Sequence, residues 1–97
     1  MKGDYSIGSR KWNGLSKIQE ETAELNVILG KLVGCNGNTN HWSGNLANCL
    51  IDELADTQAS LEYFIEKNMG KKCQQKIARR KQKKLDLYEQ WNKSDDD

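Results

Sequence analysis

Proline is absent from this 97-residue chain. Proline interrupts helices, so its absence, together with apolar residues at helical spacing, predicts an all-α protein. Cysteine is also scarce: Cys35, Cys49 and Cys73 contain no C-x-x-C pair, which argues against a structural zinc site and a disulfide framework. We therefore expect three reduced thiols.

Long apolar runs are missing as well. No segment approaches the roughly 20 apolar residues that a membrane-spanning helix needs. Residues 1–13 lack the apolar stretch of a signal peptide. We therefore expect a cytoplasmic protein without a membrane partner, located in the host cytoplasm if it is phage-encoded.

Hydrophobic residues make up only 36% of the chain and charged residues 30%. A single domain of this size and composition has a thin core. Small chains often complete such a core by oligomerisation. We expect a homo-oligomer, either a dimer or a tetramer.

Charge is distributed unevenly along the chain. Residues 1–70 contain six Lys/Arg and nine Asp/Glu, whereas residues 71–93 contain nine Lys/Arg and two Asp/Glu. Three aspartates close the sequence, which divides it into one domain at 1–94 and an acidic tail at 95–97. The basic segment indicates either a nucleic-acid-binding helix or a source of ligands for phosphate.

Apolar periodicity predicts three helices. The first covers 15–32, with Ser16 and Gln19 as a capping box and Gly34 as its stop. The second covers 46–65 and ends before Gly70, and the third covers 73–91. The segment 35–45 is rich in Gly and Asn, which predicts a loop.

Two acidic pairs lie inside the first two predicted helices. Glu21 and Glu24 share one helical face, as do Glu53 and Asp56, because each pair is three residues apart. In an antiparallel hairpin the four carboxylates would converge and raise one another's pKa. A hard divalent cation relieves that repulsion, and Mg²⁺ favours carboxylate oxygen, water and phosphate. The pattern predicts a phosphate-handling metal site.

The arrangement Glu20-Glu21-x-x-Glu24, followed after 28 residues by Glu53-x-x-Asp56, resembles the E-E-x-x-E…E-x-x-D signature of MazG-like all-α nucleoside triphosphate pyrophosphohydrolases. The resemblance covers roughly residues 12–92 and is greatest to the short phage and bacterial branch, which includes MazZ-like enzymes. Segments outside the acids that carry it are Gly14-Leu15-Ser16-Lys17, Gly30-Lys31-Leu32, His41-Trp42-x-Gly44, Phe64-Ile65-x-x-Asn68 and Ile77-x-x-Arg80-x-x-x-Lys84-Leu85-x-x-Tyr88-x-x-Trp91. The N-terminus departs from larger members, because it is too short for a full preceding helix.

The resemblance implies the reaction NTP + H₂O → NMP + PPi, with Mg²⁺ as cofactor and Mn²⁺ as a substitute. It implies four-helix-bundle dimers built from paired hairpins. It also implies that the metal ligands are Glu21, Glu24, Glu53 and Asp56. Glu20 points about 100° away from Glu21 on a helix. It would bind a further metal or orient the attacking water, so Glu20 and Glu21 are the expected catalytic residues.

The nucleotide itself would contact further residues, for each of which a purely structural role is the alternative. His41, Trp42 and Trp12 offer rings that can stack on a base. Asn13 offers an amide to a purine edge, whereas Asn68 is either a helix cap or, by its family position, a nucleotide ligand. The resemblance makes Arg80, Lys83 and Lys84 candidate ligands of the β- and γ-phosphates. MazZ-like enzymes prefer guanine nucleotides, so the expected substrates are dGTP and GTP.

Two other classes of function are open. The basic third helix also suits a nucleic-acid-binding helical module, although carboxylates near a groove would repel phosphate. The chain could also be an inactive helical protein that only oligomerises. Glu62 and Glu66 fit an exposed helical face four residues apart and receive no role. We expect the hydrolase, with (d)NTP rather than nucleic acid as its partner.

Overall fold

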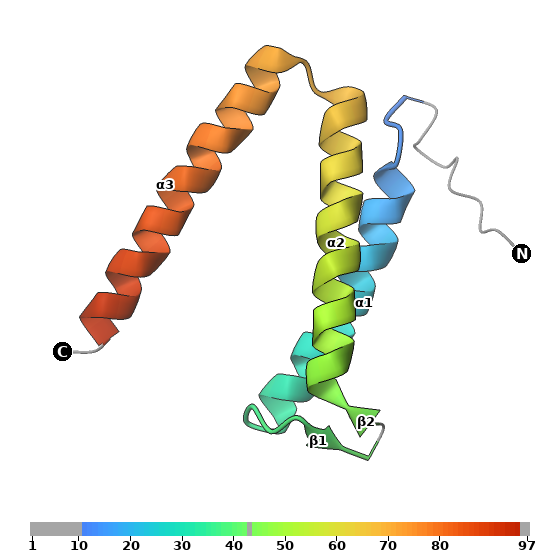
Figure 1. The fold of residues 1–97 in the computed structure, drawn as a ribbon, viewed down its shortest axis with the longest axis vertical. Helices are drawn as coiled ribbons and strands as arrows, with labels where there is room; N and C mark the ends of the chain where they lie inside the picture. The colour runs from blue at the N-terminus through green and yellow to red at the C-terminus, as the bar shows by residue number, and fades with distance from the viewer. Residues whose placement is uncertain (1–10, 43, 96–97) are drawn as a thin grey trace, which may run out of the picture.

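The computed structural model describes residues 11–42 and 44–95. It contains α1 (Leu15–Gly34), β1 (Asn40–His41), β2 (Gly44–Asn45), α2 (Leu46–Asn68) and α3 (Lys71–Asp95). Helices α1 and α2 lie side by side as an antiparallel hairpin, whereas α3 diverges from the end of α2 (Figure 1). The predicted all-α class is confirmed. Within the described residues, no helix has both the length and the apolar character required to cross a membrane.

Helix α1 begins at Leu15 as predicted, but Ser16 does not cap it. The N-cap is Gly14, whose φ of 87° lies in the left-handed region that favours glycine. Its carbonyl oxygen accepts hydrogen bonds from the backbone N–H groups of Lys17 and Ile18, both at 3.2 Å. The predicted capping box is therefore wrong, because the N-cap is a glycine two residues before Ser16.

Helix α2 has a conventional cap that the sequence analysis did not identify. The Asn45 side-chain oxygen accepts hydrogen bonds from the backbone N–H groups of Ala47 at 2.8 Å and Asn48 at 3.4 Å. The preceding loop also contains a two-residue antiparallel ladder that pairs Asn40 with Asn45 and His41 with Gly44. A ladder this short has no alternation for a sequence pattern to reveal.

The hairpin core is thin, as the composition predicts. Among the described residues only Ile28 and Leu46 are buried apolar side chains. Thr57 and Ser60 of α2 are also buried, and their small size lets α1 approach closely. The Thr57 hydroxyl donates to the backbone carbonyl of Glu21 at 3.4 Å. This contact places the acidic turn of α1 directly against α2.

Helix α3 continues beyond the predicted end and includes Asp95, the first residue of the expected acidic tail. Asp96 and Asp97 lie outside the described residues. Apolar side chains of α3 remain exposed, including Tyr88 at 52% and Trp91 at 54%. All three cysteines are free thiols.

Candidate metal centre

Three glutamates converge between α1 and α2. Glu21 and Glu24 project from adjacent turns of α1, and Glu53 projects from α2. One carboxylate oxygen from each lies within 4.8 Å of the others. Helical spacing within each helix and the antiparallel packing of the two helices produce this convergence. The acidic pairs predict four carboxylates here, and three of them form the group.

Two carboxylate oxygens of this cluster are buried without a hydrogen-bond partner. They are Glu21 Oε2 and Glu53 Oε2. A buried, unsatisfied charged oxygen costs about 1–3 kcal/mol or more, so proteins usually pair it or use it to coordinate a metal. The donor set is oxygen only, which suits Mg²⁺ and Mn²⁺. The residues present therefore fit a hard divalent cation.

The electrostatics of Glu53 reflect the same crowding. Partial burial raises the pKa of Glu53 above its ordinary value of 4.5. The negative charges of Glu24, Asp56 and Glu21 raise the pKa further, as does a hydrogen bond between the side chains of Glu53 and Glu24. A cation bound between these side chains would reverse the effect, because it favours the ionised form.

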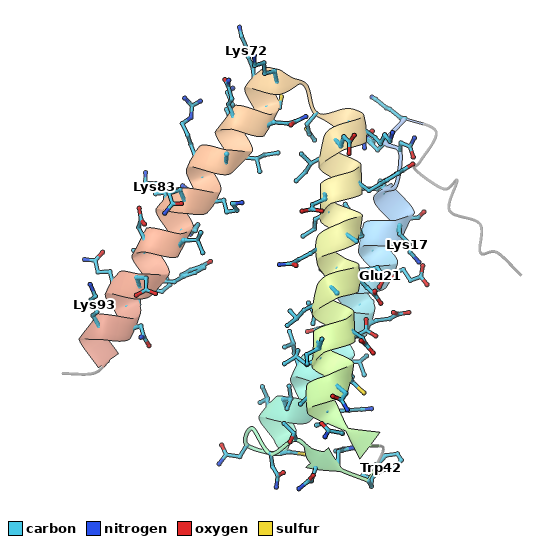
Figure 2. The ribbon with its side chains drawn as sticks, viewed as in Figure 1. Lys17, Glu21, Trp42, Lys72, Lys83 and Lys93 are labelled. Atoms are coloured by element: carbon cyan, nitrogen blue, oxygen red, sulfur yellow. The ribbon has the colours of Figure 1, made fainter. Side chains whose placement is uncertain are left out.

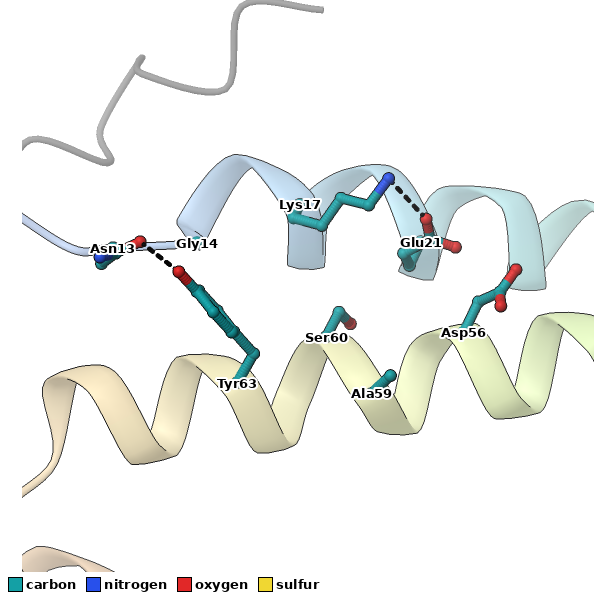
Figure 3. A pocket seen from close by; sticks show the side chains of 8 residues that line it. All are labelled: Asn13, Gly14, Lys17, Glu21, Asp56, Ala59, Ser60 and Tyr63. Carbon is teal, nitrogen blue, oxygen red and sulfur yellow. Dashed lines mark hydrogen bonds and ion pairs between the residues drawn. The ribbon is translucent and has the colours of Figure 1, made fainter. Parts of the chain in front are cut away.

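Lys17 lies at the edge of the cluster. Its Nζ is 3.0 Å from Glu21 Oε1 (Figure 3). The same Nζ is 3.2 Å from Glu20 Oε2. The Glu21 side chain is only 8% exposed, whereas that of Glu20 is 36% exposed. Glu20 is therefore the member of the Glu20–Glu21 pair that solvent reaches more readily. Lys17 holds both carboxylates in place through an i, i+3 and an i, i+4 contact.

Asp56 lies one turn beyond Glu53 on α2. It is outside the three-glutamate group but lines an open pocket of about 700 Å³ that also reaches Glu21 (Figure 3). Ala59, Ser60 and Tyr63 continue the α2 wall of this pocket. These positions are three, four and seven residues after Asp56, so they form one helical face. Sequence reasoning missed Tyr63, although this spacing from Asp56 is a signal that could have revealed it.

Asn68 fixes the position of Asn13, which lines the end of the pocket away from Asp56. Its side-chain oxygen accepts from the Asn13 backbone N–H at 2.9 Å, and its side-chain nitrogen donates to the Asn13 carbonyl at 2.7 Å and the Phe64 carbonyl at 2.8 Å. The Tyr63 hydroxyl donates to Asn13 Oδ1 at 3.3 Å. A Cβ on Gly14 would lie 3.0 Å from Tyr63 Cδ1. Asn68 thus ties the start of α1 to the end of α2.

The predicted nucleotide-binding residues do not converge in one place. Trp12, Asn13 and Asn68 lie at one end of the α1–α2 hairpin, where Trp12 stacks on Phe64 at a ring-centroid distance of 6.1 Å. Trp42 lies at the opposite end, beyond β1 (Figure 2). It is 92% exposed and 5.2 Å from the His41 ring.

The three residues predicted to bind the β- and γ-phosphates lie on α3, away from both ends of the hairpin. They are Arg80, Lys83 and Lys84. Lys83 projects from the side of α3 that faces away from the hairpin (Figure 2). Of the eight predicted nucleotide-binding residues, only Asn13 lines the pocket beside the carboxylates. The assignments of all eight stay predictions.

Comparison of the chain with protein-family models, with curated proteins and with solved structures finds no match.

Proposed function

We propose that this protein is a Mg²⁺-dependent nucleoside triphosphate pyrophosphohydrolase that converts (d)NTP to (d)NMP and pyrophosphate. The observation that carries the proposal is the convergence of Glu21, Glu24 and Glu53 with two buried carboxylate oxygens left without a partner. The resemblance of the acidic signature to that of MazG-like enzymes supports the same reaction. An adjoining pocket gives the rest of a nucleotide room to bind.

The three glutamates would hold the cation. Asp56, one turn along α2 from Glu53, would be a further ligand. When bound, Mg²⁺ supplies positive charge that offsets the charge of the phosphate chain. The Lys17 ammonium, which pairs with Glu20 and Glu21, also lines the pocket and would add positive charge beside a bound phosphate. Arg80, Lys83 and Lys84 would add further positive charge, from the same chain or from a neighbouring subunit.

Glu20 is the best-placed general base. It lies next to Glu21, is partly exposed, and is oriented by Lys17 at 3.2 Å. In the proposed step, water oxygen forms a bond to the α-phosphorus as the bond from that phosphorus to the bridging oxygen breaks. Pyrophosphate departs and Glu20 accepts the proton from the water. Glu21 would be a metal ligand and would also help to keep the attacking water in position.

The pocket between Asn13 and Asp56 would receive the sugar and base. Tyr63 and Ala59 provide apolar contact there, and Asn13 provides an amide. The larger face of a purine gains more from such contact, which is consistent with the expected preference for dGTP or GTP. Ser60 and Thr57 are too buried to act as nucleophiles toward phosphate.

A panel assay tests the proposal. The full chain is incubated with each of the four dNTPs and four NTPs and Mg²⁺, and chromatography separates NMP from NDP. We expect NMP and pyrophosphate, with no product in EDTA. Asp56→Asn should abolish product, whereas Asp52→Asn is the matched control, since Asp52 is an exposed carboxylate on the same helix. Release of NDP and phosphate, or no turnover of any nucleotide, would refute the proposal.

A further inference from the structure

Both N–H donors of the Asn68 side chain, on the last residue of α2, already have acceptors. The side-chain nitrogen donates to the backbone carbonyls of Asn13 at 2.7 Å and Phe64 at 2.8 Å. A primary amide has two N–H donors, and here each has its own carbonyl partner. Asn68 could therefore donate to a nucleotide only by giving up one of these backbone contacts.

The contact between Asn68 and Asn13 involves both polar groups of the Asn13 backbone. The Asn68 side-chain oxygen accepts from the Asn13 N–H at 2.9 Å, while the side-chain nitrogen donates to the Asn13 carbonyl. Two opposed hydrogen bonds, like those exchanged by paired residues of antiparallel strands, fix the orientation of a peptide segment as well as its distance. Asn68 is therefore suited to hold the Asn13 backbone in one orientation against α2.

Residues 12–14 form a short segment before the first turn of α1, and we call them the entry segment. Aromatic side chains of α2 hold the residues on either side of its centre. Trp12 stacks on Phe64 at a ring-centroid distance of 6.1 Å. The Tyr63 ring lies against Gly14, where an added Cβ would be 3.0 Å from the ring. The entry segment is thus positioned by tertiary contacts with the end of α2.

The entry segment forms one end of the pocket described above. Asn13 and Gly14 line this end, and Asn13 Oδ1 accepts from the Tyr63 hydroxyl at 3.3 Å (Figure 3). Glu21 and Asp56 line the pocket nearer the carboxylate cluster. Tyr63 follows Asp56 by seven residues, which corresponds to about 10 Å along the α2 axis. A nucleotide with its phosphates at the carboxylate end would therefore extend its nucleoside toward the entry segment.

We propose that Asn68 is a positioning residue for nucleotide binding, which holds the entry segment against the sugar and base without touching the nucleotide itself. The inference rests on the proposed function for the identity of the ligand. It gives Asn68 a role different from the ligand role that its family position implies. A wall contact of this kind is made alike in the substrate complex and the transition state, so its loss raises KM and leaves kcat.

Asn68→Ala tests this role in the full chain. The substitution should raise KM for dGTP roughly tenfold and change kcat by less than about twofold. Pyrophosphate with Mg²⁺ lacks the nucleoside, so it should inhibit wild type and Asn68→Ala with the same inhibition constant. Asn92→Ala is the matched control, because it removes an exposed amide from α3, and it should behave as wild type. An unchanged KM in Asn68→Ala, or an equal weakening of pyrophosphate and dGTP, would overturn the proposal.

Tryptophan fluorescence separates a positioning role from direct contact with the nucleotide. In a chain with Trp42→Phe and Trp91→Phe, Trp12 is the only tryptophan, and acrylamide quenching reports how far it is covered. Trp12 is 40% exposed in its stacked position, so its release in Asn68→Ala should raise the quenching constant before any nucleotide is added. A raised KM with unchanged quenching of Trp12 would make Asn68 a direct ligand and overturn the proposal.

Circular dichroism checks the helical content of each variant. Asn68→Asp replaces Asn68→Ala if helical content is lost, because it keeps an acceptor for the Asn13 N–H but has no donor at neutral pH. Wild-type turnover with an unchanged KM in the variant overturns this inference alone. If wild type binds dGMP in calorimetry without turning over dGTP, the proposed function fails, and the dGMP affinities of wild type and Asn68→Ala decide this inference. A wild type that does neither overturns both.

Discussion

The Oε2 atoms of Glu21 on α1 and Glu53 on α2 are both buried, and neither has a hydrogen-bond partner. Two such oxygens on adjacent helices oppose folding unless a proton or a cation satisfies them. Bringing these acids together therefore lowers the free energy of unfolding of the hairpin, and binding of a cation can restore it. This pairing of the two helices is the structural basis of the proposed metal centre.

Mg²⁺ should accordingly raise the melting temperature of the wild-type protein. A ligand at 100 times its dissociation constant stabilises the folded state by about 2.7 kcal/mol. Glu24→Gln should abolish both that shift and hydrolysis, while the melting temperature without Mg²⁺ is kept or raised because carboxylate repulsion is relieved. Asp52→Asn should behave as wild type in the same thermal melts. A full Mg²⁺ shift in Glu24→Gln would remove Glu24 from the metal site.

The raised pKa of Glu53 predicts how metal-free stability depends on pH. Between its ordinary pKa of 4.5 and the higher folded-state pKa, the folded protein binds more protons than the unfolded chain. Stability without Mg²⁺ should therefore fall as pH rises through that window. Glu53→Gln should flatten this part of the profile, as measured by urea unfolding in EDTA from pH 4 to 7. An unchanged slope in the variant would show that Glu53 is not the group responsible.

Gly14 should be intolerant of a side chain. Its φ of 87° would strain an alanine by about 1–2 kcal/mol. The added Cβ would also meet the Tyr63 ring at 3.0 Å. Gly14→Ala should lower the free energy of unfolding by at least that amount in urea titrations. Gly30→Ala is the control: nothing lies within 4 Å, and it should stabilise α1 by about 0.5–1 kcal/mol. Equal effects of the two substitutions would contradict this account of the helix start.

Trp12 and Trp42 lie at opposite ends of the hairpin, so at most one of them can stack on a base bound beside the carboxylates. Trp12 adjoins Asn13, which lines the pocket. Trp12→Ala should therefore weaken nucleotide binding by about 1–3 kcal/mol, mainly as a rise in KM. Trp42→Ala is assayed in parallel against all four dNTPs. If neither substitution changes KM, stacking is not how the base is held, and a best substrate of dCTP or dUTP would overturn the expected purine preference.

Helix positions and the acidic cluster were predictable because they depend on local spacing. The apolar repeat located α1, α2 and α3, and the i, i+3 acids placed Glu21 and Glu24 opposite Glu53. Other features depend on tertiary contact and could not be read from spacing. Asn68 holds the Asn13 backbone across 55 residues. Gly14, not Ser16, is the cap, and the Tyr63 ring lies close to where a Cβ on Gly14 would be. The divergence of α3 from the hairpin could not be predicted either, since the apolar repeat of α3 indicates a helix but not what that helix contacts.

The position of bond cleavage tests the central claim most directly. Wild type is incubated with dGTP and Mg²⁺ in ¹⁸O-labelled water, and mass spectrometry locates the label. Attack at the α-phosphorus predicts labelled dGMP with unlabelled pyrophosphate, and loss of both products in Glu53→Gln. Label in pyrophosphate or in free phosphate, or unchanged dGTP with the folded wild-type protein, would contradict a pyrophosphohydrolase built on these glutamates.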